Sequence, residues 1–149
     1  MTIEFPDSAN RPGREIPGSA AQDDELTHPR LWQGLAWCMV WVVVWLSLTP
    51  HPPEPPAFLA WDKAQHCLAY AFLMFWFRQA FSKTWRWPLF LVALGVGIEF
   101  LQGYGGFRVF DRLDMLANSI GVVLGFMLAN TSLGGLVVSV DALIFRRAA

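Results

Sequence analysis

The sequence has little charge and little cysteine, and each shortage argues against a class of protein. Only 15% of its 149 residues are charged and 54% are hydrophobic, whereas soluble domains have about 25% charged and about 45–50% apolar residues. The net charge is −1, and no basic stripe or RNA-binding motif is present, so we expect no nucleic acid as a partner. The two cysteines, Cys38 and Cys67, form no CxxC motif and are too few for a disulfide framework. The composition favours a membrane protein.

The first 30 residues differ from the rest of the chain. Residues 1–30 are polar, contain proline and glycine, carry the acidic run Asp23–Glu25, and show no apolar periodicity. They predict a disordered cytoplasmic tail. The tail is too long and too acidic for the basic start of a signal peptide, and no cleavage motif follows the first apolar run. We therefore expect that run to remain as a membrane anchor.

Apolar segments follow one another along the remaining chain, each approaching the length of about 20 residues that crosses a bilayer. A proline-rich stretch after Thr49, a short basic turn and a glycine-rich loop separate them. The sequence therefore predicts an all-α integral membrane bundle of four transmembrane helices, forming one domain over residues 31–133. The predicted spans are Leu31–Leu48, Ala64–Phe81, Pro88–Gln102 and Leu113–Ser132.

The C-terminal end, residues 134–149, contains one further apolar piece. Leu136–Phe145 is too short to span a membrane alone and is interrupted by Asp141. We expect it either to extend the fourth helix or to lie at the membrane interface, on the cytoplasmic side.

Lysine and arginine are unevenly distributed between the connecting segments, and this asymmetry predicts orientation. With the N-terminus inside, eight of these residues are cytoplasmic and three are outside. The sequence thus predicts a multi-pass protein with both termini in the cytoplasm. The eight are Arg11, Arg14, Arg30, Arg78, Lys83, Arg86, Arg146 and Arg147, and the three are Lys63, Arg108 and Arg112.

Polar residues from three predicted helices fall at a similar depth near the outer interface. Asp62, His66 and Tyr70 are spaced four residues apart, so they share one helix face. Ionisable groups inside a membrane are costly unless they are paired, and they commonly mark function. We therefore predict an outward-facing polar pocket in which the charged groups pair with one another. Its candidate residues are Asp62, Lys63, His66, Tyr70, Glu99, Gln102, Arg108, Asp111, Asp114 and Asn118.

Two glycines continue the helix stripe of Asp114 and Asn118. Gly121 and Gly125 are four residues apart, a spacing that lets a neighbouring helix approach closely. We predict a packing role for them. The same stripe is a surface through which a homo-oligomer could form.

The ordered set of polar positions resembles the VanZ-like family of membrane proteins, and the resemblance covers residues 31–132. It implies a protein of the bacterial inner membrane and cell envelope, in a family whose founding member is associated with resistance to the glycopeptide teicoplanin. It implies neither a biochemical activity nor antibiotic resistance for this chain. The pattern reads Asp62-Lys63-x-x-His66-x-x-x-Tyr70, Glu99-x-x-Gln102, and Arg108-x-x-Asp111-x-x-Asp114-x-x-x-Asn118-x-x-Gly121-x-x-x-Gly125.

Three functions are compatible with these residues, of which the first is preferred. The pocket could bind the headgroup of a membrane lipid or a lipid-linked cell-wall precursor, with Lys63 and Arg108 as the cationic contacts. It could instead belong to a membrane-embedded hydrolase or transferase acting on such a lipid, with Glu99 or His66 as general base. A small transporter is the third, although four helices are few and no inverted repeat is visible.

Each polar residue also has a purely structural interpretation. His66 could bond Asp62 or Glu99 to fix helix packing, Glu99 could pair with Arg108, and Asp111 could cap the fourth helix. Asp62, His66, Glu99 and Asp114 carry the oxygen and nitrogen ligands that a divalent ion accepts. The chain has no HExxH motif, however, and these residues come from separate helices. The sequence therefore predicts no metal and no cofactor.

Overall fold

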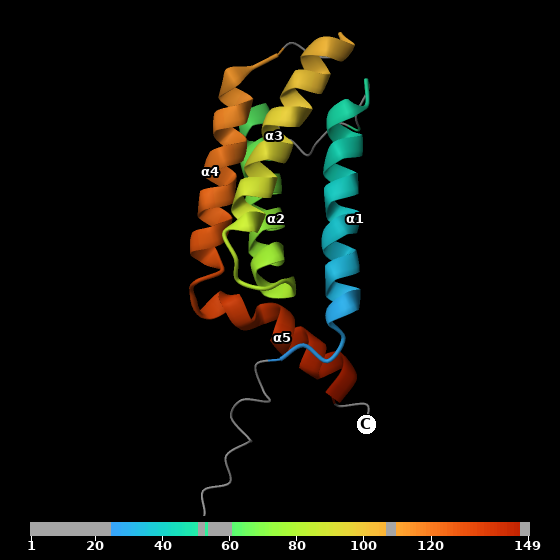
Figure 1. The fold of residues 1–149 in the computed structure, drawn as a ribbon, viewed down its shortest axis with the longest axis vertical. Helices are drawn as coiled ribbons and strands as arrows, with labels where there is room; N and C mark the ends of the chain where they lie inside the picture. The colour runs from blue at the N-terminus through green and yellow to red at the C-terminus, as the bar shows by residue number, and fades with distance from the viewer. Residues whose placement is uncertain (1–24, 51–52, 54–60, 107–109, 147–149) are drawn as a thin grey trace, which may run out of the picture.

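The computed structural model describes residues 25–50, 53, 61–106 and 110–146, and this part of the chain is helical with no strand. Four helices form an upright bundle: α1 (Pro29–Leu48), α2 (Asp62–Ala80), α3 (Arg86–Gly105) and α4 (Arg112–Leu128) (Figure 1). A 3-10 turn (Ser132–Gly135), the short helix α5 (Leu136–Asp141) and a π-helical turn (Ala142–Arg146) follow. Arg108 and residues 1–24 of the predicted tail lie outside the described residues.

The helix α2 occupies the centre of the bundle and packs most extensively on α4. The two helices run in the same direction: Lys63 at the start of α2 bonds Asp114 near the start of α4, and Arg78 near the end of α2 bonds Asn130, just beyond α4. The helices α1 and α3 run the opposite way (Figure 1). The buried core consists of Tyr70, Leu73, Met74 and Phe77 from α2, with Ala36, Val40, Leu91 and Val122 from the other helices.

Four membrane spans were predicted, and the described helices support two or three. Only α1 and α3 are by themselves long and apolar enough to cross a membrane. The helix α4 qualifies only together with residues 132–145, and the two parts are bent by 78°. The helix α2 does not qualify, because Lys63 and His66 occupy its first turns and Arg78 its last. Many of its apolar side chains are buried by the other helices, so α2 needs less contact with lipid than its sequence suggested.

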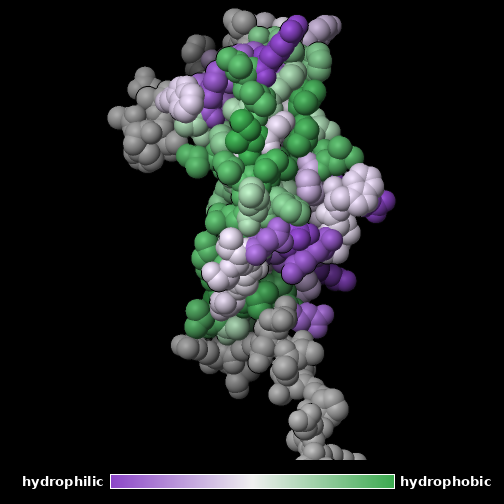
Figure 2. All heavy atoms as spheres, turned by 90° about the vertical axis from the view of Figure 1, so that its left-hand side faces the viewer, coloured by the Kyte–Doolittle hydropathy of each residue, from purple (hydrophilic) through white to green (hydrophobic). Residues whose placement is uncertain are grey.

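Large apolar side chains also cover much of the outer surface. Trp41 is 71% exposed, Trp45 60% and Met127 62%. Figure 2 shows the molecule from the left-hand side of Figure 1. On this face, hydrophobic residues lie between hydrophilic residues at the top and a hydrophilic band lower down. Monomeric soluble proteins rarely expose such continuous apolar surface. The surface is therefore compatible with a membrane environment.

The contact between α2 and α4 is close because two glycines lack side chains. A Cβ atom on Gly121 would lie 2.3 Å from the carbonyl oxygen of Cys67, and one on Gly125 would lie 2.1 Å from that of Ala71. The predicted packing role of these glycines is confirmed. Within a single chain, α2 covers the glycine stripe that we had considered for self-association.

The short helix α5 lies across the base of the bundle, where α1 begins (Figure 1). The fully buried carboxylate of Asp141 accepts a hydrogen bond from Trp32 Nε1 at 2.7 Å and one from the backbone N–H of Thr27 at 2.6 Å. The bend after α4 therefore makes α5 a brace for the start of α1 rather than a straight extension of α4. Helix α1 begins at Pro29, two residues before the predicted span.

The glycine contact generates the first testable prediction. We expect Gly125→Ala to lower the stability of the bundle by about 1–3 kcal/mol, because the added methyl group would force α2 and α4 apart. Gly97→Ala is the matched control, since Gly97 is exposed on α3 and its Cβ would meet nothing within 4 Å. That variant should be neutral or slightly more stable. Thermal denaturation in detergent measures both, and equal melting temperatures would contradict the close packing.

The brace at Asp141 generates a prediction about pH. Burial favours the neutral acid, but the hydrogen bonds from Trp32, Thr27 and His28 outweigh it and lower the pKa of Asp141 to about 2. The pKa of Asp141 is thus lower in the folded protein than in the unfolded chain. Its carboxylate therefore stabilises the fold fully at neutral pH, and this contribution is lost as the pH falls from about 5 toward 2. We expect Asp141→Asn to be less stable than wild type at pH 7, with a difference that shrinks over that interval.

Thermal denaturation across the pH series measures the difference. Trp32→Phe keeps an aromatic ring but removes the N–H that donates to Asp141, so it should reduce the pH dependence of stability. A gap between wild type and Asp141→Asn that is the same at every pH would rule out this role of the carboxylate.

Candidate functional site

Most of the predicted site residues meet at the end of the bundle where α2 and α4 begin and α3 ends. We call this group the polar cluster. It joins three helices that are separate in sequence, as the prediction required. Its members are Asp62, Lys63 and His66 of α2, Glu99 of α3, and Asp111, Asp114 and Asn118 at the start of α4.

The Lys63 ammonium binds two carboxylates. Its Nζ atom lies 2.6 Å from Asp111 Oδ2 and 2.6 Å from Asp114 Oδ1. Asp111 also caps α4, as predicted, because its side chain accepts a hydrogen bond from the backbone N–H of Leu113 at 2.8 Å. The Lys63 ammonium and this capping bond lower the pKa of the Asp111 carboxyl group. Lys63 is thus already neutralised, which makes it a weaker contact for an anionic headgroup than the sequence suggested.

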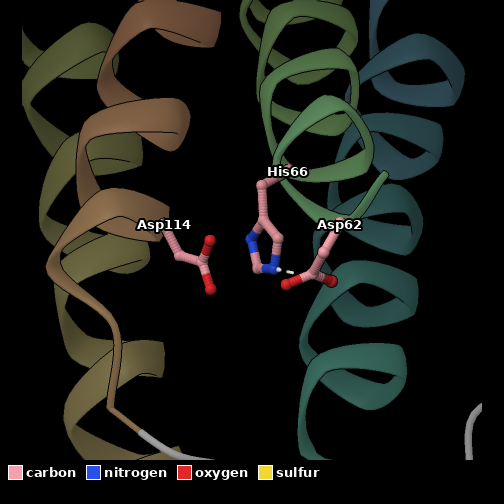
Figure 3. A group of neighbouring side chains, drawn as sticks. All are labelled: Asp62, His66 and Asp114. Carbon is pink, nitrogen blue, oxygen red and sulfur yellow. Dashed lines mark ion pairs between the residues drawn. The ribbon is translucent and has the colours of Figure 1, made fainter. Parts of the chain in front are cut away.

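The His66 ring lies between two aspartates and is held by an asparagine. Its Nδ1 atom lies 3.1 Å from Asn118 Oδ1, and its Nε2 atom lies 3.8 Å from Asp62 Oδ1. Asp114 faces the ring from α4 (Figure 3). Because an amide oxygen only accepts, the Nδ1–H of His66 donates to Asn118, and this contact orients Nε2 toward Asp62. The bond to Asn118 was not anticipated from the sequence, which suggested Asp62 or Glu99.

Asn118 also packs against α3, and a glycine makes this possible. A Cβ atom on Gly95 would lie 3.0 Å from Asn118 Nδ2. Gly95 was missed in the sequence analysis, although it precedes Glu99 by four residues and so lies on the same helix face. The amide of Asn118 therefore sits where α2, α3 and α4 meet.

Glu99 is the least satisfied member of the polar cluster. Its side chain is fully buried, and its Oε2 atom accepts a long hydrogen bond of 3.4 Å from the backbone N–H of Asp111. Its Oε1 atom has no hydrogen-bond partner among the described residues. The predicted partner, Arg108, lies outside them. A buried polar atom without a partner is costly and calls for a specific explanation.

Two other candidate residues lie apart from the ion pairs. Gln102 donates from Nε2 to the backbone oxygen of Ser47 at 2.7 Å, so it ties α3 to the end of α1 and not to the polar cluster. Tyr70 is buried in the helix core. Its hydroxyl group has no partner within the described part of the chain.

The Lys63 contacts generate a prediction about stability. We expect Lys63→Met to destabilise the protein by about 1–3 kcal/mol, because Asp114, whose side chain is only 10% exposed, would lose its counter-ion. Lys83→Met is the matched control, since Lys83 is exposed at the opposite end of the bundle. Adding Asp114→Asn to Lys63→Met should restore part of the loss. Thermal denaturation in detergent tests this, and equal effects at Lys63 and Lys83 would refute it.

Comparison with known families gives one match. The VanZ/LLP1 family profile matches residues 19–134, which is more than half of the chain and includes the whole polar cluster. Comparison with curated proteins and with solved structures found no match. The matched range contains every position on which the resemblance in the sequence rested. The chain belongs to the VanZ/LLP1 family.

Proposed function

We propose that this protein crosses the bacterial cytoplasmic membrane several times and that its polar cluster binds the headgroup of a lipid or lipid-linked cell-wall precursor at the outer face. The observation that carries the proposal is the fully buried Glu99 carboxylate, whose Oε1 atom has no partner among the described residues. Ionisable groups in such positions are expensive and commonly mark binding sites or pathways.

The distribution of basic residues supports the outward orientation. Arg30, Arg78, Lys83 and Arg86 belong to the end of the bundle opposite the polar cluster, where α2 ends and where α1 and α3 begin. By the positive-inside tendency, that end faces the cytoplasm. The start of α1 and the helix α5 lie at the same end, so both termini would be cytoplasmic (Figure 1).

The hydrogen-bonding state of the polar cluster suggests how a headgroup would be held. Lys63, Asp111 and Asp114 satisfy one another, whereas Glu99 Oε1 and Asn118 Nδ2 are buried without partners in the described structure. Hydroxyl or amino groups of a sugar-containing headgroup would donate to Glu99. Arg108, which precedes Asp111 by three residues in the sequence, would contact its phosphate. The teicoplanin resistance associated with the founding member of the family makes a cell-wall precursor the favoured lipid.

A second candidate function is a membrane-embedded hydrolase or transferase acting on the same lipid. The observation that favours it is the position of His66, whose imidazole, a common general base, is oriented by Asn118 on one side and Asp62 on the other. Turnover of a lipid-linked substrate that is lost in His66→Ala and in Glu99→Gln would select this function over binding alone.

The binding proposal predicts a separation between variants at the two ends of the bundle. In nanodiscs, we expect the protein to bind a polyprenyl-diphosphate-linked disaccharide, with affinity falling about tenfold or more in Glu99→Gln and in Arg108→Ala, since loss of one charge-assisted hydrogen bond is worth about 1.5–3 kcal/mol. Arg86→Ala is the matched control because Arg86 is exposed at the opposite end. Microscale thermophoresis or native mass spectrometry measures the binding. No binding by wild type, or equal affinities in all variants, would exclude the proposal.

A further inference from the structure

We propose that the polar cluster contains a binding site for a divalent metal ion, with Asp62, His66 and Asp114 as its ligands. Each side chain offers one ligand atom, and these atoms all lie within 4.8 Å of one another (Figure 3). Neighbouring ligands of a tetrahedral ion with bonds of about 2.1 Å lie about 3.4 Å apart. Closing the site therefore requires side-chain shifts of about an ångström, which side-chain rotation can supply while the helices stay where they are.

The donor set is that of an open metal site. Two carboxylate oxygens and one imidazole nitrogen leave coordination positions free for water or a ligand, as in three-ligand zinc sites. His66 meets a further requirement, because a metal-binding histidine almost always donates its other N–H to an oxygen that fixes the ring. Asn118 Oδ1, 3.1 Å from Nδ1, occupies that position. The nitrogen that remains, Nε2, is the one that faces Asp62.

The charge of the polar cluster favours a cation. In its described part, the polar cluster has the carboxylates of Asp62, Asp111 and Asp114 but a single ammonium, that of Lys63, which binds Asp111 and Asp114. Asp114 uses Oδ1 for Lys63 and has a second oxygen to offer. Carboxylates crowded together repel one another unless positive charge is added between them. A divalent ion supplies that charge.

Glu99 gives an independent indication that the site is incomplete. Its carboxylate is fully buried, and its Oε2 atom accepts a hydrogen bond of 3.4 Å from the backbone N–H of Asp111, three residues before the ligand Asp114. Its Oε1 atom has no partner among the described residues. An ion between the helices, or water bound to that ion, would provide the missing partner.

The chemistry of the ligands selects the class of ion. Imidazole suits Zn²⁺ and other transition metals, whereas Mg²⁺ prefers oxygen ligands and retains its water. We therefore expect Zn²⁺ or Mn²⁺ to bind more tightly than Mg²⁺. An ion held here would also allow an acidic cluster to accept a phosphate group, but metal binding itself does not depend on the proposed headgroup binding.

Metal uptake by the intact protein tests the inference. The tag-free chain, purified in detergent and stripped with a chelator, is dialysed against Zn²⁺, Mn²⁺ or Mg²⁺, and bound metal is measured by mass spectrometry. We expect about one Zn²⁺ or Mn²⁺ per chain, little or none in His66→Ala and Asp62→Asn, and an affinity about 10–100-fold lower in Asn118→Ala, which keeps all three ligands but removes the partner that orients His66. Co²⁺ should give visible absorption bands that His66→Ala abolishes.

The controls separate this inference from misfolding and from the proposed function. His28→Ala removes a histidine at the base of the bundle, where its ring contacts Phe145, and should leave uptake unchanged. Asp62→Asn alters the first residue of α2 without changing its size, so it remains informative if His66→Ala fails to fold. Equal uptake in wild type, His66→Ala and Asp62→Asn would reveal an adventitious ion only and overturn the inference, as would no uptake of any metal. No precursor is present in this assay, so its outcome is independent of headgroup binding.

Discussion

The close approach of α2 and α4 at Gly121 and Gly125 is the constraint on which the polar cluster depends. Backbone carbonyls of α2 occupy the space that side chains at these positions would need. The two helices, which run in the same direction, therefore lie side by side, and their first turns meet. Lys63 can then reach Asp114, and His66 can reach Asn118. With bulkier residues in place of the glycines, the same polar side chains would belong to two separate helices and would lack these partners.

The buried acids at the two ends of the bundle have different surroundings. At the base, the carboxylate of Asp141 receives hydrogen bonds from an indole and two backbone amides, which is the pattern of a purely structural group. At the other end, Glu99 is equally buried but keeps one oxygen without a partner among the described residues. This unsatisfied oxygen is the observation on which the proposed headgroup binding rests.

Much of this organisation could be predicted from the sequence, because helical periodicity fixes which residues share a face. The apolar segments, the cap at Asp111 and the packing role of Gly121 and Gly125 follow from composition and from spacing within single segments. The order of the polar positions along the chain carried the resemblance to the family. The separation of helices in the sequence, by contrast, argued against a metal site. The ligand atoms of Asp62, His66 and Asp114 nevertheless come within 4.8 Å of one another, because the first turns of α2 and α4 pack against each other.

The sequence by itself determined that the chain is a helical protein with apolar segments and that its polar residues are concentrated on a few helix faces. The tertiary structure decided which faces meet: that Lys63 binds two aspartates, that Gln102 contacts α1, that α2 is buried at the centre and that α5 bends back beneath α1. The physical reason is that periodicity orients a side chain about its own helix axis. The choice of neighbouring helix depends instead on contacts between distant segments, such as the backbone approach that only glycine allows.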